Sequence, residues 1–204
     1  VIPDVTAESP TSSLVIDLVA VLATPARDPV ETLLSNENTE SGLLGFAMHP
    51  DFASNGYFYL SYEVSMEGDN TFGYQRLSRF TVPAAQIDQP SPEADPSSEL
   101  ILIEQRDRQD SHSGSDLHFG ADGYLYWSVG DEGYPNDHWG NSQRIDMNFF
   151  GGMLRIDVDK KPGNLEPNAH PNPAAGGLGY SWTDAIPRDE IPVGSGIYKA
   201  RYSI

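Results

Sequence analysis

The chain has no cysteine, little positive charge and no long apolar run, and each absence excludes a class of protein. Without cysteine among its 204 residues, it forms neither disulfides nor thiolate metal sites. Its 12 Lys and Arg stand against 30 Asp and Glu, a formal net charge of -18, which disfavours binding to nucleic acid or to anionic membranes. No run approaches the ~20 apolar residues that cross a membrane. The composition therefore favours a small, neutral or cationic partner.

Glycine and proline are frequent, and they interrupt the chain too often for long helices. Val, Ile, Tyr and Phe gather in short runs that are typical of strands. The apolar run Leu14–Ala23 is broken by Asp17 and follows no basic segment, which favours a strand over a secretion signal. We therefore expect an all-β protein, with strands at Leu14–Leu22, Tyr57–Val64, Gln75–Val82, Leu100–Gln105, Leu117–Phe119, Tyr124–Val129 and Met153–Val158.

An internal repeat suggests how these strands are arranged. The segment Asn55–Ser61 reads NGYFYLS, and Asp122–Ser128 reads DGYLYWS. Repeated units of short antiparallel strands indicate a β-propeller, in which similar sheets pack around a central channel. A β-sandwich is the alternative on the pattern alone.

The segment from His112 to Gly133 predicts a hairpin with chemistry at its open end. Asp122-Gly123 suits a tight turn, because both residues tolerate a positive φ, and the flanking aromatic and branched residues favour strands. If the two strands pair around this turn, His112 before the first strand and Asp131 after the second emerge at the same end. Such a pair acts as a base and the group that orients it.

Two proline-rich stretches are predicted to be loops. Pro83–Ser98 is acidic and connects two expected strands, and Lys161–Gly179 is dense in glycine and proline without an apolar period. Neither resembles a linker between domains. We expect residues 1–204 to form one domain or part of one.

The remaining histidines are predicted to be structural or stay unassigned. His118 lies in an expected strand as a packed or hydrogen-bonded side chain, and His49 braces the turn before Tyr57. His138 and His170 lie in polar loops without ligand spacing.

The acidic residues after the hairpin offer oxygen atoms for a cation, but their spacing matches no known calcium loop. They are Asp131, Glu132, Asp137 and Asp146. Asp131 has a structural alternative as the cap of a glycine-rich loop. Arg155 is expected to pair with Asp157 or with neighbouring acids across a sheet. The sequence contains no Gly-x-Ser-x-Gly elbow, no phosphate-binding loop and no Rossmann fingerprint.

Three ordered motifs carry a family resemblance. Glu40–Phe52 (ESGLLGFAMHPDF), the His112 hairpin and Gly152–Asp159 (GMLRIDVD) resemble the soluble quinoprotein glucose and sorbosone dehydrogenases, also called aldose sugar dehydrogenases. The resemblance covers Glu40 to Asp159. It implies a six-bladed β-propeller that uses pyrroloquinoline quinone (PQQ) and Ca²⁺ to oxidise sugars, with this chain covering about three to four blades as an N-terminal part.

The resemblance also implies roles for three residues. His112 matches the general base that removes the hydroxyl proton of the sugar while hydride passes to the quinone, and Asp131 matches the acidic residue beside it. Glu40 falls where the family has a Gln or Glu near the substrate. The family's quinone ligands and main calcium ligands are expected in blades beyond Ile204, so the cofactor-binding and metal-binding residues are not assigned in this chain.

Several functional alternatives follow. A sugar or alcohol dehydrogenase that passes electrons to a separate acceptor is the first; a periplasmic or secreted location fits it. A non-catalytic propeller module that binds carbohydrate or protein is the second, because a propeller fold alone does not establish activity. A calcium-dependent hydrolase of propeller shape is the third. None of the three requires nucleic acid or membrane insertion.

Overall fold

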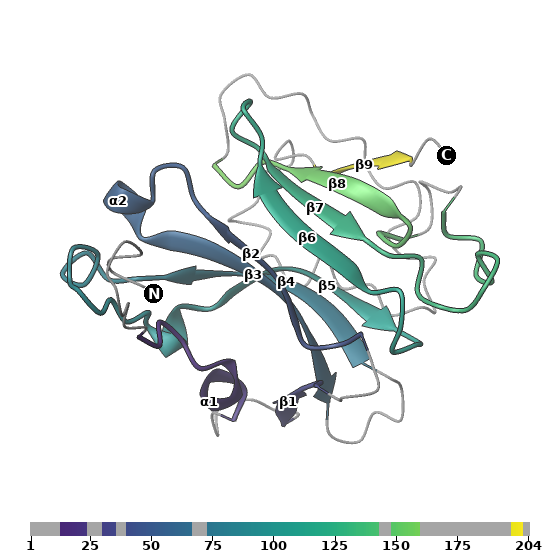
Figure 1. The fold of residues 1–204 in the computed structure, drawn as a ribbon, viewed down its shortest axis with the longest axis horizontal. Helices are drawn as coiled ribbons and strands as arrows, with labels where there is room; N and C mark the ends of the chain where they lie inside the picture. The colour runs from purple at the N-terminus through teal and green to yellow at the C-terminus, as the bar shows by residue number, and fades with distance from the viewer. Residues whose placement is uncertain are drawn as a thin grey trace, which may run out of the picture.

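A computed structural model describes residues 13–23, 30–35, 40–66, 73–142 and 148–159, and the backbone of 197–201. These residues form two antiparallel sheets that lie against one another (Figure 1). The expected all-β class is confirmed. Among the described residues, no helix has the length and apolar character needed to cross a membrane.

Apart from β1, which pairs with β3, the strands of both sheets follow one another in chain order. The first contains β1 Glu31–Leu33, β2 Leu43–Met48, β3 Tyr57–Met66, β4 Gly73–Thr81 and β5 Leu100–Asp107, with β1 and β2 both pairing with β3. The second runs β6 Gly114–Phe119, β7 Leu125–Val129, β8 Gly152–Ile156 and β9 Ile197–Arg201. Two four-stranded meanders, β2–β5 and β6–β9, are the units from which propellers are built. The described residues thus hold two such meanders, and the count of three to four blades stays a prediction for the whole chain.

The internal repeat marks the same position in each blade. Asn55–Ser61 leads into β3 and Asp122–Ser128 into β7, which are the second strands of their meanders. The registers correspond as well, since Phe58 pairs with the last residue of β2 and Leu125 with the last residue of β6. The prediction of repeated blade-like units is confirmed here.

The predicted strand Leu14–Leu22 is wrong. The chain forms helix α1 at Leu18–Leu22, and Asp17 is its N-cap, accepting hydrogen bonds from the Val19 and Ala20 amides at 3.0 and 3.3 Å. Asp17, which breaks the apolar run in the sequence, is therefore a helix start signal. The short strands β1, β2 and β9 and the four-residue helix α2 (Phe52–Asn55) were not predicted.

The β6–β7 hairpin is confirmed, but its connection is longer than a two-residue turn. Residues 120–124 connect the strands, and the Gly123 amide donates to the Gly120 carbonyl at 2.8 Å. Gly123 has φ +76°, and the Asp122 carboxylate accepts from the Tyr124 amide at 3.2 Å. Gly123 thus has the expected positive φ, whereas Asp122 does not, and the pair lies within a wider turn.

The main core lies between the two sheets, where β2 faces β6 (Figure 1). Its fully buried members include Tyr59, Leu77 and Ile103 from the first sheet and Leu117, Trp127 and Leu154 from the second. This core fixes one hairpin of the second sheet against the first, which determines where the ends of β6 and β7 project.

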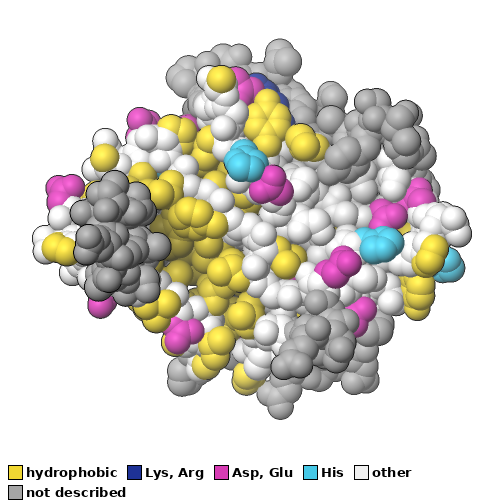
Figure 2. Space-filling model, viewed as in Figure 1, with side chains coloured by type: hydrophobic (Ala, Val, Ile, Leu, Met, Phe, Trp, Pro, Cys, Tyr) yellow, Lys and Arg dark blue, Asp and Glu magenta, His cyan; other side chains and the backbone are white. Residues whose placement is uncertain are grey.

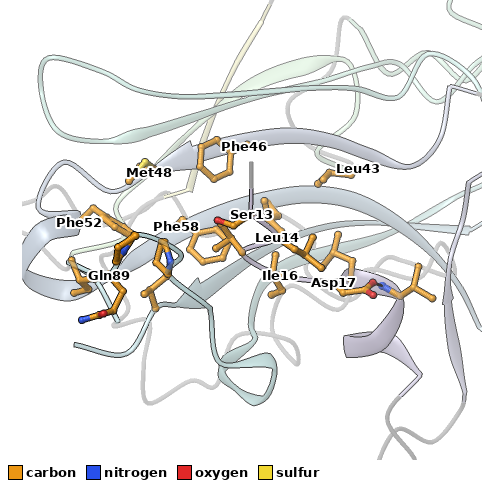
Figure 3. A pocket seen from close by; sticks show the side chains of 18 of the residues that line it. Ser13, Leu14, Ile16, Asp17, Leu43, Phe46, Met48, Phe52, Phe58 and Gln89 are labelled. Atoms are coloured by element: carbon orange, nitrogen blue, oxygen red, sulfur yellow. Dashed lines mark hydrogen bonds between the residues drawn. The ribbon is translucent and has the colours of Figure 1, made fainter. Parts of the chain in front are cut away.

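The opposite face of the first sheet packs against α1 and carries an apolar groove of about 960 Å³ (Figure 3). Phe46 and Met48 of β2 project into it, and the Pro83–Ser98 loop, which ends in the 3₁₀ helix η1 at Pro96–Ser98, borders it. Figure 2 shows hydrophobic side chains gathered left of centre in the view, whereas acidic side chains are scattered over the whole face. Neither His112, Asp131 nor Glu40 lines the groove.

Candidate active site

His112 and Asp131 meet at the open end of the β6–β7 hairpin. His112 Nδ1 lies 2.8 Å from Asp131 Oδ1, and the two side chains are 46% and 21% exposed. A carboxylate only accepts hydrogen bonds, so Nδ1 carries the proton and Nε2 presents its lone pair. The sequence predicted that the hairpin brings His112 and Asp131 together, and the structure shows this contact.

The backbone of His112 is held in a left-handed conformation, with φ +57°. Its carbonyl lies so close to Gly130 that a Cβ there would be 1.4 Å from the oxygen. The Gly130 amide also donates to the Ser113 carbonyl at 3.1 Å. A non-glycine residue in this region is strained, and it persists only where its surroundings fix it. Only glycine at position 130 permits this geometry.

Glu40 contacts the same loop from the first sheet's side. Its carboxylate accepts a hydrogen bond from the His112 backbone amide, and its own amide donates to the Asp110 carbonyl at 3.0 Å. The structure thus brings the three predicted residues together. The Glu40 carboxylate contacts the backbone of His112 rather than its imidazole.

Two buried glutamines, which the sequence analysis missed, hold the loop from below. Gln75 Nε2 donates to the Ser113 carbonyl at 2.6 Å and to Ser115 Oγ at 3.2 Å. Gln105 Nε2 donates to Gln75 Oε1 at 3.0 Å, and Gln105 Oε1 accepts from the Phe149 amide at 3.2 Å. We call Gln75 and Gln105 the amide chain. In the sequence, each of the two is the single amide side chain of a predicted strand, and this was the feature that could have identified them.

Two buried carboxyl groups lie beside the amide chain. Burial raises the pKa of Asp107 to about 8, and the nearby charges of Glu63 and Glu132 add to this effect, while the Gln109 amide and Arg108 oppose it. Burial also raises the pKa of Glu63, against the effect of the Ser113 and Ser41 hydroxyls. Interior carboxyl groups of this kind favour the protonated, neutral form.

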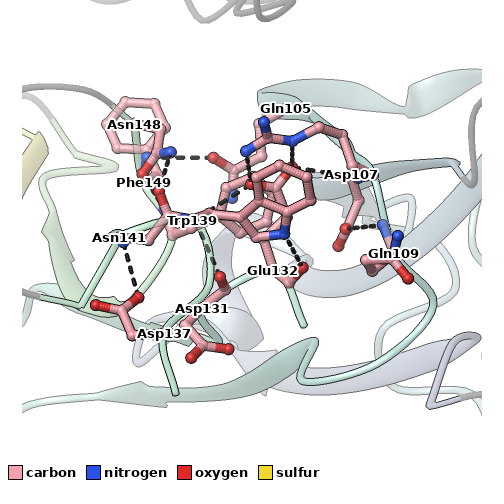
Figure 4. A network of polar contacts seen from close by, with 12 residues as sticks. Gln105, Asp107, Gln109, Asp131, Glu132, Asp137, Trp139, Asn141, Asn148 and Phe149 are labelled. Atoms are coloured by element: carbon pink, nitrogen blue, oxygen red, sulfur yellow. Dashed lines mark hydrogen bonds and ion pairs between the residues drawn. The ribbon is translucent and has the colours of Figure 1, made fainter. Parts of the chain in front are cut away.

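The loop after Asp131 is fixed by a polar network (Figure 4). Arg108 Nε donates to Glu132 Oε1 at 2.5 Å, Asn141 Nδ2 donates to the Asp131 carbonyl at 3.0 Å, and Asp137 Oδ1 accepts from the Asn141 amide at 2.8 Å. Glu132 is buried. The acidic residues after the hairpin are therefore engaged separately, with Asp146 outside the described residues.

Within the described ranges, no three His, Cys, Asp or Glu side chains converge in a way that would hold a metal ion. Glu132 pairs with Arg108, Asp137 caps backbone amides, and Asp131 contacts His112. Asp131 uses its carboxylate for the histidine and its carbonyl for Asn141, which is not the loop-capping arrangement considered from sequence.

The other singled-out side chains have structural contacts. His49 is buried, with Nδ1 2.8 Å from Asn55 Nδ2 and accepting from the Asp51 amide at 3.0 Å, so it braces the turn as predicted. His118 is exposed rather than packed, and its Nε2 lies 3.0 Å from Asp116 Oδ2. His170 lies outside the described residues.

Arg155 pairs across the second sheet with a neighbouring acid, as expected. Its Nε donates to Asp122 Oδ2 at 3.0 Å and to Tyr126 Oη at 3.2 Å, so Asp122 is the partner rather than Asp157. The predicted loop Lys161–Gly179 lies outside the described residues.

Known proteins resemble this chain over most of its described length. It is 30% identical to the mouse (Mus musculus) Hedgehog-interacting protein over 120 residues, covering 59% of this chain and 17% of that protein. It is 27% identical to the HIPL1 protein of Arabidopsis thaliana (63% and 22% covered) and 25% identical to quinoprotein glucose dehydrogenase B of Acinetobacter calcoaceticus (64% and 29% covered). The chain thus spans less than a third of these relatives.

Among solved structures, the PQQ-bound aldose sugar dehydrogenase of Streptomyces coelicolor matches with 25% identity and a TM-score of 0.44, over 66% of this chain and 36% of that one. A model of the Glucose / Sorbosone dehydrogenase family matches residues 17–176, which include all three motifs and the His112–Asp131 pair. The chain belongs to the glucose/sorbosone dehydrogenase family.

Proposed function

We propose that this chain is part of a quinoprotein oxidoreductase that oxidises a hydroxyl group of a sugar or related alcohol. His112 would be the general base, Asp131 its orienting partner and Glu40 a residue near the substrate. The observation that carries this proposal is the 2.8 Å contact between His112 Nδ1 and Asp131 Oδ1 at a partly exposed position. Membership in the family supports it.

The pair suits proton abstraction. With Nδ1 bonded to Asp131, Nε2 accepts the hydroxyl proton, and the adjacent carboxylate stabilises the imidazolium that forms. The Glu40 contact and the amide chain hold the backbone of the His112 loop, and Asp131 orients the ring. A base held in one orientation loses little entropy on reaching the reactive geometry.

The described residues fit the proton-handling half of this chemistry. When bound, PQQ supplies the two-electron acceptor that takes hydride from the carbon bearing the hydroxyl. The Arg108 guanidinium, which lies near the site, is already engaged by Glu132 and Trp139. We therefore infer that the carboxylates of the quinone, and the Ca²⁺ expected with it, would be held by residues outside the described ranges.

The surroundings favour a neutral substrate. Glu40, Asp110, Asp116 and Asp131 flank the histidine loop, and the whole chain carries a formal charge of -18. Anionic substrates would be repelled, whereas hydroxyl groups can donate to these carboxylates. A sugar oxidised in the periplasm or outside the cell, with electrons passed to a separate acceptor, fits these properties.

A binding module is the second candidate. The resemblance to Hedgehog-interacting protein favours it, because that relative is named for an interaction. In that case the His112–Asp131 pair would be a structural contact, and no cofactor would be needed.

Titration calorimetry with PQQ and Ca²⁺, followed by dye reduction with a panel of aldoses, separates the two candidates. Quinone binding with sugar-dependent dye reduction is expected for the dehydrogenase. In that protein, His112→Ala should lower kcat by about 10²–10⁴-fold while quinone affinity stays the same. His118→Ala is the matched control, since His118 also pairs with an aspartate but at an exposed strand position. Because the quinone ligands are expected outside the described residues, the titration uses the full length that the gene encodes. Folded protein of that length that binds no PQQ would favour the binding module.

A further inference from the structure

The loop that follows Asp131 holds an unusual series of backbone conformations. Glu132, Tyr134, Asn136 and Asp137 all have positive φ, at 72°, 67°, 66° and 50°. Such conformations are unfavourable for residues with a Cβ and cluster where other contacts enforce them. The loop is therefore held in a shape that its own residues do not prefer.

Contacts beneath the loop enforce this shape. Glu132 is buried against Arg108, and its carbonyl accepts a hydrogen bond from Trp139 Nε1 at 3.1 Å. The Arg108 guanidinium lies 3.7 Å from the centre of the Trp139 ring, and Asp137 caps the amides of Asn141 and Ser142 (Figure 4). Trp139 is thus fixed from one side by a cation and from its edge by a hydrogen bond.

This fixed frame displays an aromatic surface. Tyr134 is 46% exposed, and its ring centre lies 5.1 Å from that of His138 and 6.1 Å from that of Trp139. His138 meets Trp139 edge to face at 4.6 Å. We call Tyr134, His138 and Trp139 the aromatic shelf. Tyr134 belongs to neither of the two buried apolar clusters of the described residues.

The aromatic shelf adjoins the His112–Asp131 pair. The loop begins at Asp131 itself, and the turn before Tyr134 packs on the segment that leads into His112. A Cβ on Gly133 would lie 2.9 Å from Ser111 Oγ and 2.8 Å from Gln109 Cβ. The aromatic shelf thus lies on the loop that follows Asp131, and this loop packs against the segment that leads into His112.

We propose that the aromatic shelf binds the ring of a neutral cyclic sugar, and that this positions one of its hydroxyl groups at His112. The electron-rich face of an aromatic ring attracts the polarised C–H groups that a pyranose presents on one face. The acidic surroundings accept its hydroxyl groups and disfavour anions. A pre-ordered aromatic ring costs little entropy on binding. This inference rests on the proposed function for the reaction, but the binding surface is defined independently of it.

Nuclear magnetic resonance of the full chain with labelled aromatic side chains tests the proposal without turnover. Methyl β-D-glucopyranoside should shift the Tyr134 and His138 ring signals saturably, and acyclic sorbitol at equal concentration should not. Tyr134→Ala should weaken pyranoside binding by about tenfold, or 1.4 kcal/mol, whereas Tyr134→Phe should retain it. Alanine is as strained as tyrosine at a positive φ, so the substitution removes the ring without relieving the backbone.

Tyr124→Ala is the matched control, because Tyr124 lies at the other end of the hairpin, beneath Arg155. It should leave pyranoside affinity unchanged. The proposal is overturned if no pyranoside shift occurs, or if Tyr134→Ala binds or oxidises pyranosides as well as the unaltered chain. Saturable shifts at Tyr134 in a chain that fails to reduce dye would support the aromatic shelf and contradict the dehydrogenase. Dye reduction with an unchanged KM in Tyr134→Ala would support the dehydrogenase and contradict the aromatic shelf.

Discussion

Two neighbouring rows of side chains cross β3, β4 and β5 on opposite faces of the sheet. Both rows contain buried polar groups, but one row forms ion pairs and the other forms hydrogen bonds between neutral amides. Adjacent residues of a strand point to opposite faces. On the groove side, Tyr62, Arg76 and Glu104 are cross-strand partners. On the side of the second sheet, Glu63, Gln75 and Gln105 are partners one residue further along. We call these the arginine row and the glutamine row.

The arginine row compensates charge with charge. Arg76 is buried and donates to Glu31 at 2.8 and 2.9 Å and to Glu104 at 2.7 Å. Burial alone lowers the pKa of the guanidinium, but the hydrogen bond with Glu31 and the charge of Glu104 raise it above its ordinary value. Tyr62, whose pKa is raised by burial and by the charge of Glu99, donates to that carboxylate. This row locks β1 onto the sheet.

The glutamine row compensates polarity with neutral amides. Gln75 and Gln105 connect β4 and β5 to the Ser113 carbonyl, next to His112, while Asp107 and Glu63 nearby favour the protonated form. The comparison teaches that one sheet uses ion pairs where it needs fixed stability. It uses neutral amides where it supports the backbone of the His112 loop.

Removing Arg76 should have the largest effect. Arg76→Met leaves Glu31 and Glu104 buried without their cation, and breaking a buried pair in this way costs about 3–5 kcal/mol of unfolding free energy. Urea unfolding monitored by circular dichroism measures it. Arg155→Met is the matched control at a half-exposed pair with Asp122 and should cost less than about 1 kcal/mol. Equal losses in the two variants would refute the distinction between buried and exposed pairs.

Asp107, which lies two residues beyond Gln105 in β5, should make stability depend on pH. Its pKa is about 8 in the folded chain against an ordinary 3.8, so between these values the folded state keeps a proton that the unfolded state has lost. Stability therefore falls as pH rises through this window, by at most about 1.4 kcal/mol per pH unit, or about 3 kcal/mol from pH 5 to pH 7. Glu63 contributes with the same sign.

Asp107→Asn separates this contribution from that of other acids, because asparagine stays neutral and can still accept from the Gln109 amide at the observed 3.0 Å. The difference in unfolding free energy between this variant and the unaltered chain should grow in favour of the variant from pH 5 to pH 7. A difference that stays constant with pH would show that Asp107 titrates normally in the folded protein.

Removing the Gln75 amide should lower stability less than the changes above, and it should increase the mobility of the His112 loop. Gln75→Leu leaves the Ser113 carbonyl without its buried donor, at a cost of about 1–3 kcal/mol. Amide hydrogen exchange at residues 112–115 should accelerate, and the imidazole of His112 should lose its single orientation in nuclear magnetic resonance spectra. Gln89→Leu, at an exposed loop position, is the control. Unchanged exchange at residues 112–115 in Gln75→Leu would remove the amide chain from the support of the loop.

Local signals in the sequence predicted the hairpin and its open end. Asp122-Gly123 and the aromatic strands around it are nearest neighbours along the chain, so the hairpin and the meeting of His112 with Asp131 follow from short-range chemistry. The repeat of Asn55–Ser61 predicted equivalent strands for the same reason. The strand predicted around Asp17 is wrong because a lone carboxylate in an apolar run is compatible with an interrupted strand as well as with a helix cap.

The sequence by itself determined the all-β class, the acidic surface without disulfides and the local frame of the candidate site. The tertiary structure decided which buried polar residues support the candidate site. Gln75, Arg76, Gln105 and Asp107 look alike as polar residues in strands, and only the packing of one sheet on the other decides which face is buried beside which partner. The contacts of these residues depend on which elements bury them, and not on residue type alone. The cost of removing a polar group from water is set by all the elements that surround it.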